Sequence, residues 1–350
     1  MSLATQLNDR IKQYGPITVA DYMRTALLHP EFGYYTRKDP LGIQGDFITA
    51  PEISQIFGEL IGLWLAEQWR ILGKPESIIV EPGPGRGTLM ADIIRATQHV
   101  QGFHDAISIH FIEGSPVLRE KQKQALKGHH PRVQWHTDFK KLPAKPLLLA
   151  ANEFFDALPV RQFMYAADGW CERMVNVDAE GKLHFILVRE IPPVDFPAVS
   201  DVIFEYGEDG AHITRTISTH IRTHGGAGVI VDYGFDGGSR GDTLQAVKNH
   251  KFHDTLHDPG TADLSCHVDF ERMKRNAEAQ KVAAYGPVTQ GAFLNALGAK
   301  ARAAILCKNA PHKKASVISG LERLLSPDTM GHLFKVLCIV PMKHPKPEGF

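Results

Sequence analysis

The sequence predicts an α/β fold, in which a parallel sheet is covered by helices on both faces. Two observations lead to this prediction. From Ser77 onward, short apolar runs typical of buried strands alternate with segments whose apolar residues recur at helical spacing. The first apolar run, 78–80, leads through Glu81 into a glycine-rich turn and then into a helical segment. Strand, glycine turn and helix in this order open the type of sheet that binds nucleotide-like ligands.

The region before the sheet, residues 1–75, is predicted to be a helical cap, and residues 76–350 are predicted to form the sheet domain. Residues 18–28 have the pattern of a helix. Thr49 and Glu52 are spaced as a capping box, in which the threonine hydroxyl and the glutamate three residues later satisfy free amides at a helix start. The helix that they open is expected to pack a broad apolar face against the core.

The sheet domain contains apolar runs that each predict one strand. These runs are 78–81, 107–112, 132–136, 146–151, 228–233 and 333–340. Residues 160–205 interrupt the alternation of strand and helix. Three short runs separated by turn residues predict antiparallel strands there, at 162–165, 171–177 and 183–188. We therefore expect a small β-rich insertion at about 160–205.

The composition limits the kinds of partner and the location. Lys and Arg together number 39, and so do Asp and Glu, so the net charge is near zero. Because a broad basic field is absent, no nucleic acid partner is expected. No apolar run has the length of a membrane span, so no membrane insertion is expected. The N-terminal residues lack the apolar core of a signal peptide and the arginine-rich bias of a transit peptide, which predicts a cytoplasmic location.

No bound metal is expected either. The four cysteines lie far apart, and no pair has the spacing of a zinc knuckle. His250, His253 and His257, with Asp254 and Asp258, could hold a metal if they were helical. Their spacing matches no established zinc signature, so we set this cluster aside.

The glycine-rich turn indicates which ligand the sheet binds. Gly83, Gly85 and Gly87 have the pattern Gly-x-Gly-x-Gly, whereas a dinucleotide phosphate loop has its third glycine one residue later. This spacing favours S-adenosylmethionine, which has no phosphate but needs close approach of the backbone and a carboxylate near its cationic end. Glu81 is placed to supply that carboxylate. The predicted cofactor-binding residues of this segment are Glu81, Gly83, Pro84, Gly85, Gly87 and Thr88. The alternative is a tight turn without a ligand.

The next two strand ends add candidate cofactor contacts, because ligands of open α/β sheets bind beyond the carboxyl ends of the strands. Glu113 follows the second strand and could accept hydrogen bonds from both ribose hydroxyls; its alternative is a solvated loop carboxylate. Asp138 follows the third strand and could accept the adenine amino group, with Phe139 against the ring. A turn-forming role is the alternative for Asp138.

The fourth strand end is predicted to face the methyl acceptor. There an amide, two acids and two aromatic rings gather in Asn152, Glu153, Phe154, Phe155 and Asp156. Carboxylates at this position could orient an amine or a guanidinium, while phenylalanine walls exclude water. For one of the two phenylalanines, simple packing is the alternative.

Several ordered motifs of the chain resemble the MidA family. The motifs that carry the resemblance are 45–54, 57–59, 81–89, 152–159, 231–234, 259–264, 267–270 and 289–294. The resemblance runs from about Gly15 to Val340. It implies a class I S-adenosylmethionine-dependent methyltransferase with a Rossmann-like seven-strand sheet and an N-terminal helical cap. Mitochondrial members of this family assist the assembly of respiratory complex I by methylating an arginine in one of its subunits.

Residues and resemblance together give the hypothesis of a protein arginine methyltransferase that uses S-adenosylmethionine. Its client would be a subunit of respiratory complex I or a similar protein. The predicted catalytic residues are Glu153, Asn152 and Asp46, and Glu52, Phe154, Phe155 and Asp156 are predicted to contact the substrate. The alternatives are a methyltransferase for a small molecule or RNA, and an assembly chaperone that binds the cofactor without catalysis. The oligomeric state, including a homodimer, stays open.

Overall fold

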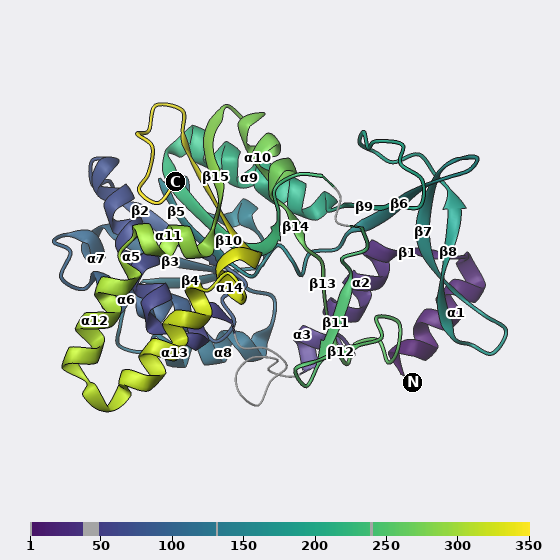
Figure 1. Ribbon diagram of the computed structural model, residues 1–350, viewed down its shortest axis with the longest axis horizontal. Helices are drawn as coiled ribbons and strands as arrows, with labels where there is room; N and C mark the ends of the chain where they lie inside the picture. The colour runs from purple at the N-terminus through teal and green to yellow at the C-terminus, as the bar shows by residue number, and fades with distance from the viewer. Residues whose placement is uncertain (1, 38–48, 131, 239–240) are drawn as a thin grey trace. The chain divides into compact units, whose positions relative to one another are not determined.

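The computed structural model describes residues 2–37, 49–130, 132–238 and 241–350, which fold into two compact units (Figure 1). Each unit is made of three segments of the chain. We call the larger one the sheet unit; it comprises Ile48–Phe154, Ile213–Asp236 and Val268–Phe350. The second unit comprises Met1–Phe47, Phe155–His212 and Gly237–His267. The predicted division into residues 1–75 and 76–350 stays a prediction.

The sheet unit is built on one large, mostly parallel sheet, which confirms the predicted fold class. Its strands lie side by side in the order β4 (Val133–His136), β3 (Ile107–Ile112), β2 (Ser77–Pro82), β5 (Leu147–Asn152), β10 (Gly226–Phe235), β16 (Phe334–Pro341) and β15 (Val282–Thr289). Neighbouring strands pair in parallel except β16, which is antiparallel to both of its neighbours. The short β14 (Val268–Asp269) pairs with the end of β10. The carboxyl ends of β2, β3, β4, β5 and β10 therefore meet at one edge.

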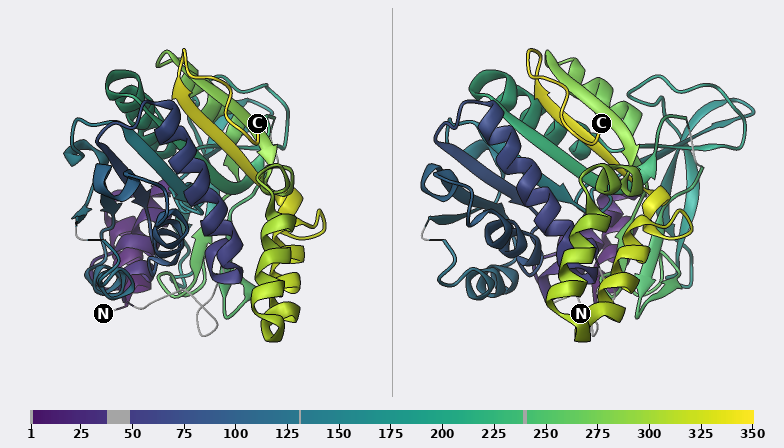
Figure 2. Two further views of the ribbon diagram at one scale, coloured as in Figure 1. Left: turned by 90° about the vertical axis from the view of Figure 1, so that its left-hand side faces the viewer. Right: turned by 60° about the vertical axis from the view of Figure 1, so that its left-hand side comes forward.

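Helices cover both faces of this sheet, as Figure 2 shows. Along β10 the side chains alternate between the faces. Ala227, Val229 and Val231 join one core cluster with apolar residues of α5 (Gln55–Ile71) and α6 (Thr88–Thr97). The position of Gly228 faces the other way, toward Ile221 of α9 (Glu208–His224). Burial on both sides explains why these strands are continuous apolar runs rather than alternating ones.

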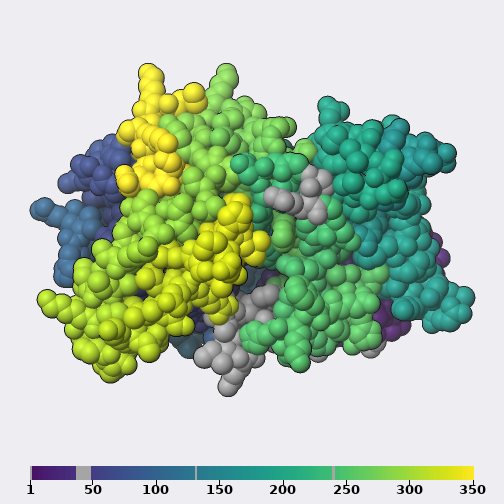
Figure 3. All heavy atoms as spheres, in the orientation of Figure 1, coloured from purple at the N-terminus to yellow at the C-terminus, as the bar shows by residue number. Residues whose placement is uncertain are grey.

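The remaining elements of the sheet unit are helical. They are α4 (Ala50–Ile53), α7 (Phe103–Ala106), α8 (Pro116–Ala125), the short helix η1 (Phe139–Lys141), α10 (Phe270–Glu278), α11 (Gln290–Ala296), α12 (Ala299–Asn309), η2 (Pro311–Lys313), α13 (Lys314–Leu325) and α14 (Met330–Leu333). In the space-filling view, side chains of α12 and α13 form the surface over one side of this unit (Figure 3).

Helices α5 and α6 approach each other closely because α5 carries two glycines one turn apart. A Cβ atom at Gly62 would lie 2.9 Å from the Cα atom of Ile93, and one at Gly58 would lie 2.6 Å from Cβ of Asp92. Neither distance is tolerable for a larger residue. This contact fixes the position of α6, the helix that begins directly after the glycine-rich turn.

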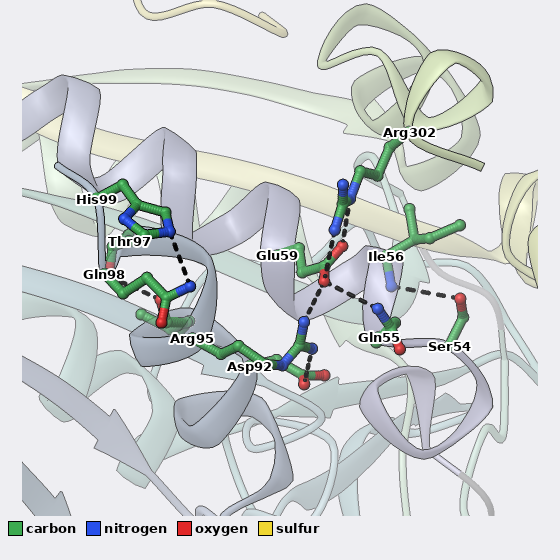
Figure 4. Close-up of polar contacts among 11 residues, drawn as sticks. Ser54, Gln55, Ile56, Glu59, Asp92, Arg95, Thr97, Gln98, His99 and Arg302 are labelled. Carbon is green, nitrogen blue, oxygen red and sulfur yellow. Dashed lines mark hydrogen bonds and ion pairs between the residues drawn. The ribbon is translucent and has the colours of Figure 1, made fainter. Parts of the chain in front are cut away.

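An ion cluster around the buried Glu59 joins the same two helices to α12 (Figure 4). Glu59 of α5 is 1% exposed and accepts hydrogen bonds from Arg95 of α6, from Arg302 of α12 at 2.6 and 3.1 Å, and from Gln55 at 2.9 Å. Arg95 also pairs with Asp92. Burial by itself would raise the pKa of Glu59, but the bonds and charges of Arg302 and Arg95 outweigh it and lower the pKa below its usual value.

The capping box predicted at Thr49 and Glu52 was wrong. Thr49 precedes α4 but makes no side-chain capping bond, and Ser54 separates α4 from α5 and caps the longer helix through Ile56 N–H at 3.3 Å. The side chain of Glu52 is engaged elsewhere, because its Oε1 accepts the hydroxyl of Thr88 at 2.8 Å. A sequence spacing cannot reveal this competition, since Thr88 comes from a different element.

The second unit combines helices α1 (Leu3–Tyr14), α2 (Val19–Leu28) and α3 (Tyr34–Arg37) with two antiparallel sheets. One sheet has the order β1 (Ile17–Thr18), β7 (Gly169–Val177), β6 (Arg161–Ala166) and β9 (Ile203–Tyr206), and β8 (Leu183–Arg189) pairs with β7. The other consists of β12 (Lys251–His253), β11 (Gln245–Lys248) and β13 (Asp263–Ser265). The N-terminal strand β1 pairs with β7, so the N-terminal segment and the predicted insertion share one sheet. None of the described helices of either unit is long and apolar enough to cross a membrane.

Candidate active site

The glycine-rich turn after β2 depends on a backbone conformation that favours glycine. Gly83, Gly85 and Gly87 have φ angles of +58°, +53° and +84°. In this left-handed region a side chain collides with the backbone, so three glycines in five residues have a local reason. The N–H of Gly87 donates to the carbonyl of Pro84 at 2.7 Å, and α6 begins at the next residue, Thr88. The turn thus leads from the carboxyl end of β2 directly into α6.

Glu81 is a buried acid with an unused acceptor. It is 4% exposed, and its Oε2 atom has no hydrogen-bond partner among the described residues. Burial raises the pKa of its carboxyl well above the usual range. On the neighbouring strand β5, Oδ1 of Asn152 is buried and likewise has no hydrogen-bond partner within the part of the chain that the structure describes. Buried polar atoms are normally satisfied, so two unsatisfied oxygens at one sheet edge fit a ligand with a cationic, hydrogen-bond-donating end.

Glu113 follows β3, and defined donors orient its carboxylate. Its Oε1 accepts the N–H of Ser115 at 2.7 Å, and its Oε2 accepts from the side-chain amide of Gln122 at 3.1 Å. Burial raises the pKa of Glu113, while these two donors and the charge of Arg119 oppose the rise. Each carboxylate oxygen can accept a further bond. The arrangement suits two hydroxyl donors, as the predicted ribose contact requires; this role stays a prediction.

Asp138 takes the turn-forming position that was its alternative. Its Oδ1 accepts the N–H of Lys140 at 2.8 Å and caps the short helix η1. The adenine contact of Asp138 stays a prediction. Phe139 is buried, and its ring meets that of Phe154 edge-on, with centroids 6.4 Å apart. The Phe154 ring also lies against Gly83, where a Cβ atom would be only 3.1 Å from it. Phe154, which we predicted as a substrate contact, therefore lies against the glycine-rich turn.

The turn at the end of β5 holds Glu153 in an unusual backbone conformation. Its φ is +48°, which is uncommon for a residue other than glycine. Its Oε1 accepts from the backbone N–H of Ala50 and from Nδ2 of Asn152, both at 3.1 Å. The carboxylate that we predicted as catalytic thus has a defined orientation.

Asp232 at the end of β10 fixes the same turn, and the sequence did not single it out as a site residue. It is fully buried, and its two oxygens accept the N–H of Phe154 at 3.2 Å and that of Tyr233 at 2.9 Å. An aspartate inside an apolar strand run was the signal that could have identified it, because a buried acid needs a structural or functional partner.

Gln122 is a second residue that the sequence analysis missed. It is fully buried on α8 and hydrogen-bonds to the glycine-rich turn, to Glu113 and to β4. The sequence feature that could have identified Gln122 is its position, because it is a polar residue one helical turn after the buried Leu118, on the apolar face of a helical segment.

The substrate contacts predicted for Phe155 and Asp156 stay predictions. Phe155 and Asp156 belong to the second unit, where Phe155 is buried near Gly210 and the carbonyl of Asp156 accepts the N–H of Cys266 at 2.9 Å. Asp46 lies outside the described residues. Within the described ranges, no group of three or more His, Cys, Asp or Glu side chains is arranged to hold a metal ion.

The sheet order, the glycine-rich turn and the acids at successive strand ends define the class of protein, an S-adenosylmethionine-dependent methyltransferase. Comparison of this chain with known proteins leads to the same class. Residues 60–288 match the family described as "Putative S-adenosyl-L-methionine-dependent methyltransferase", and the chain belongs to this family. The predicted enzyme class and cofactor are thereby confirmed.

Individual relatives cover almost the whole chain. A protein of Mus musculus named "Protein arginine methyltransferase NDUFAF7, mitochondrial" is 41% identical over 363 residues, which cover 95% of this chain and 83% of the relative. The Homo sapiens protein of the same name is 37% identical, with 97% and 83% covered. A crystal structure of a protein from Burkholderia thailandensis bound to S-adenosyl-homocysteine superimposes with a TM-score of 0.86 at 26% identity, covering 99% of this chain and 93% of that one.

The predicted cytoplasmic location was wrong. The relatives that cover nearly all of this chain are named mitochondrial. The prediction rested on targeting features that the N-terminal residues lack, and this local signal did not identify the compartment for which the relatives are named.

Proposed function

We propose that this chain methylates an arginine side chain of a protein, and that the protein is a subunit of respiratory complex I or a similar client. The names of the relatives support an arginine acceptor. The observation that carries the proposal is Glu153, a carboxylate oriented by Ala50 and Asn152 and held at a positive φ where the fourth strand ends. A carboxylate can hold a guanidinium through paired, charge-assisted hydrogen bonds.

The residues at the strand ends would then have different roles in binding and catalysis. S-Adenosylmethionine, when bound, supplies a methyl group on a positively charged sulfur. Glu81 and the glycine-rich turn would hold its amino-acid end, and Glu113 would hold its ribose. Glu153 would orient the guanidinium so that one nitrogen faces the methyl carbon, and would accept the proton that this nitrogen loses. The Phe154 ring would exclude water. Such catalysis consists mainly of alignment and placement of charge.

The test is the variant Glu153→Gln, which keeps the size of the side chain and removes its charge. Single-turnover transfer to the client at saturating cofactor should fall about a hundredfold, the usual scale for one positioned catalytic group. Cofactor affinity, measured by calorimetry, should stay close to that of the parent. The matched control is Glu76→Gln, because the side chain of Glu76 is 78% exposed. A parental rate in Glu153→Gln would remove Glu153 from the proposed catalytic role.

The same variant separates catalysis from a chaperone that only binds the cofactor. If the client still assembles in cells that carry a cofactor-binding but inactive Glu153→Gln protein, methyl transfer is not the function. The client itself is identified by incubating a lysate with radiolabelled S-adenosylmethionine and sequencing the labelled band. A labelled RNA or small molecule, in place of a protein, would contradict the proposal.

A further inference from the structure

We propose that Gln122 is a positioning residue that locks the glycine-rich turn and Glu113 into one cofactor-binding arrangement. The inference rests on the proposed roles of that turn and of Glu113. Gln122 lies on α8, and its side chain connects three elements that are separate in the sequence.

The side-chain amide of Gln122 has every hydrogen-bonding group in use. Nε2 donates to the carbonyl of Gly85 at 2.8 Å and to Oε2 of Glu113 at 3.1 Å, while Oε1 accepts from Nε1 of Trp135 at 2.8 Å. The residue is fully buried, so water does not compete for these bonds. A buried polar group of this kind is costly unless all its partners are present.

The chemistry of the partners determines which way the amide points. The indole N–H of Trp135 can only donate, so it must face the amide oxygen. The carbonyl of Gly85 and the carboxylate of Glu113 accept, so they must face the NH₂ group. A flipped amide would oppose donor to donor and acceptor to acceptor at all three contacts. The orientation therefore follows from the partners and does not depend on an arbitrary choice between nitrogen and oxygen.

This orientation makes Glu113 an acceptor at both oxygens. Gln122 donates to one oxygen and the N–H of Ser115 donates to the other. A carboxylate held by two donors keeps its remaining lone pairs for further donors, which is what two ribose hydroxyls provide. Without Gln122, Oε2 of Glu113 would lose its described partner and the side chain could rotate away.

The same side chain also holds the glycine-rich turn. The carbonyl of Gly85 is tied to Gln122, and a Cβ atom at Gly87 would lie 3.5 Å from the Cα atom of Gln122. Helix α8 therefore packs directly on the turn at this residue. Because one amide group bonds to both, the position of the turn and the position of the ribose acceptor are coupled.

The experiment compares Gln122→Glu with Gln124→Glu, since Gln124 is exposed on the same helix. At neutral pH a carboxylate at position 122 would face the carbonyl of Gly85 and the carboxylate of Glu113. We expect the Kd of S-adenosyl-homocysteine, measured by calorimetry, to rise about thirtyfold or more. Protonation restores one donor, so the affinity of Gln122→Glu relative to the parent should recover as the pH is lowered from 8.5 to 5.5. Gln124→Glu should follow the parent at every pH.

A role in packing alone would not produce this pH dependence. A folded Gln122→Glu protein that binds like the parent at pH 8.5, or whose lost affinity does not recover at pH 5.5, would overturn the inference. If Gln122→Glu does not fold, Gln122→Met is the deciding variant, because methionine has a similar volume but no amide. Gln122→Met should weaken cofactor binding about tenfold. Parental cofactor affinity in this variant would overturn the inference.

The variant Glu113→Ala separates this inference from the proposed site. If Glu113→Ala weakens cofactor binding and the Gln122 variants do not, only the role of Gln122 is wrong. If neither position matters for binding, the assignment of Glu113 and the turn to the cofactor is wrong as well. Methyl transfer by Gln122→Met at saturating cofactor should be near the parental rate, because the expected defect is in cofactor KM.

Discussion

Glu59 and Glu81 lie in the same unit and are both nearly fully buried, with 1% and 4% of their surface exposed. Their surroundings are opposite. Glu59 accepts hydrogen bonds from two arginines and a glutamine, and the bonds and charges of the two arginines lower its pKa despite burial. Glu81 has an oxygen with no described partner, and burial raises its pKa. The hydrogen bonds of Glu59 hold α5, α6 and α12 together, whereas the unpartnered oxygen of Glu81, at the end of β2, fits the donor group of a ligand.

The largest effect that tests this comparison is expected for Glu81→Gln. Loss of the charge should weaken binding of S-adenosylmethionine by roughly 2–3 kcal/mol, the range for charge-assisted hydrogen bonds. The ligand-free protein should unfold at the same temperature as the parent or higher, because the variant removes a buried carboxylate without a full set of partners. Calorimetry and thermal unfolding measure the two effects. Unchanged affinity, or a clear loss of stability without ligand, would place Glu81 in the same class as Glu59.

Glu59→Gln should show the reverse pattern. Its charged hydrogen bonds to Arg95 and Arg302 would be weakened, and we expect a loss of about 2 kcal/mol in the free energy of unfolding. The loss stays moderate because both arginines reach solvent, with side chains 40% and 33% exposed. The control is Glu67→Gln on the same helix, where Glu67 and Arg70 form an exposed pair. The control should change stability by no more than about 0.5 kcal/mol. An equal loss of stability in Glu59→Gln and Glu67→Gln would contradict the structural role of the ion cluster around Glu59.

The two acids should also differ in pH dependence. The folded-state pKa of Glu59 lies below its usual value of 4.5, so its contribution to stability is present above that pH and is lost as the pH falls through the folded pKa. The folded-state pKa of Glu81 lies above 4.5, so any stability it contributes is present below that pH and is lost as the pH rises through the folded pKa. Unfolding of the parent and both variants between pH 3 and 8 checks the signs. At neutral pH the parent should be more stable than Glu59→Gln, and this difference should shrink on acidification. Glu81→Gln should instead be more stable than the parent at neutral pH, and this opposite difference should shrink on acidification because the parental carboxyl becomes protonated.

The smallest expected effect concerns the turn that lies beside Glu81. Gly87 has a φ of +84° and precedes α6. Gly87→Ala should cost about 1 kcal/mol of stability, because alanine is strained in the left-handed region. Gly87→Asn should cost less, since asparagine tolerates that region better. Equal stability of parent and Gly87→Ala, measured by urea unfolding, would show that the turn relaxes to another conformation.

Much of the sheet could be predicted from the sequence because its signals are local. Apolar runs and helical periodicity indicated the strands and the α/β class, and the spacing of Gly83, Gly85 and Gly87 indicated the turn and its ligand. The capping box at Thr49 and Glu52 failed for a reason outside the segment, since Thr88 engages Glu52. The predicted cytoplasmic location was wrong because the N-terminal residues, on which it rested, carried too little information about the compartment.

The sequence by itself determined the order of strands and helices and which acids follow which strands, since these depend on neighbours within a few residues. Only the tertiary structure decided which polar groups meet. Gln122 reaches a carbonyl 37 positions away, and Glu59 pairs with an arginine 243 positions away. The strand β1 near the N-terminus joins β7 of the insertion in one sheet. Such contacts form because folding removes these groups from water and each buried donor or acceptor then needs a partner, wherever in the chain that partner lies.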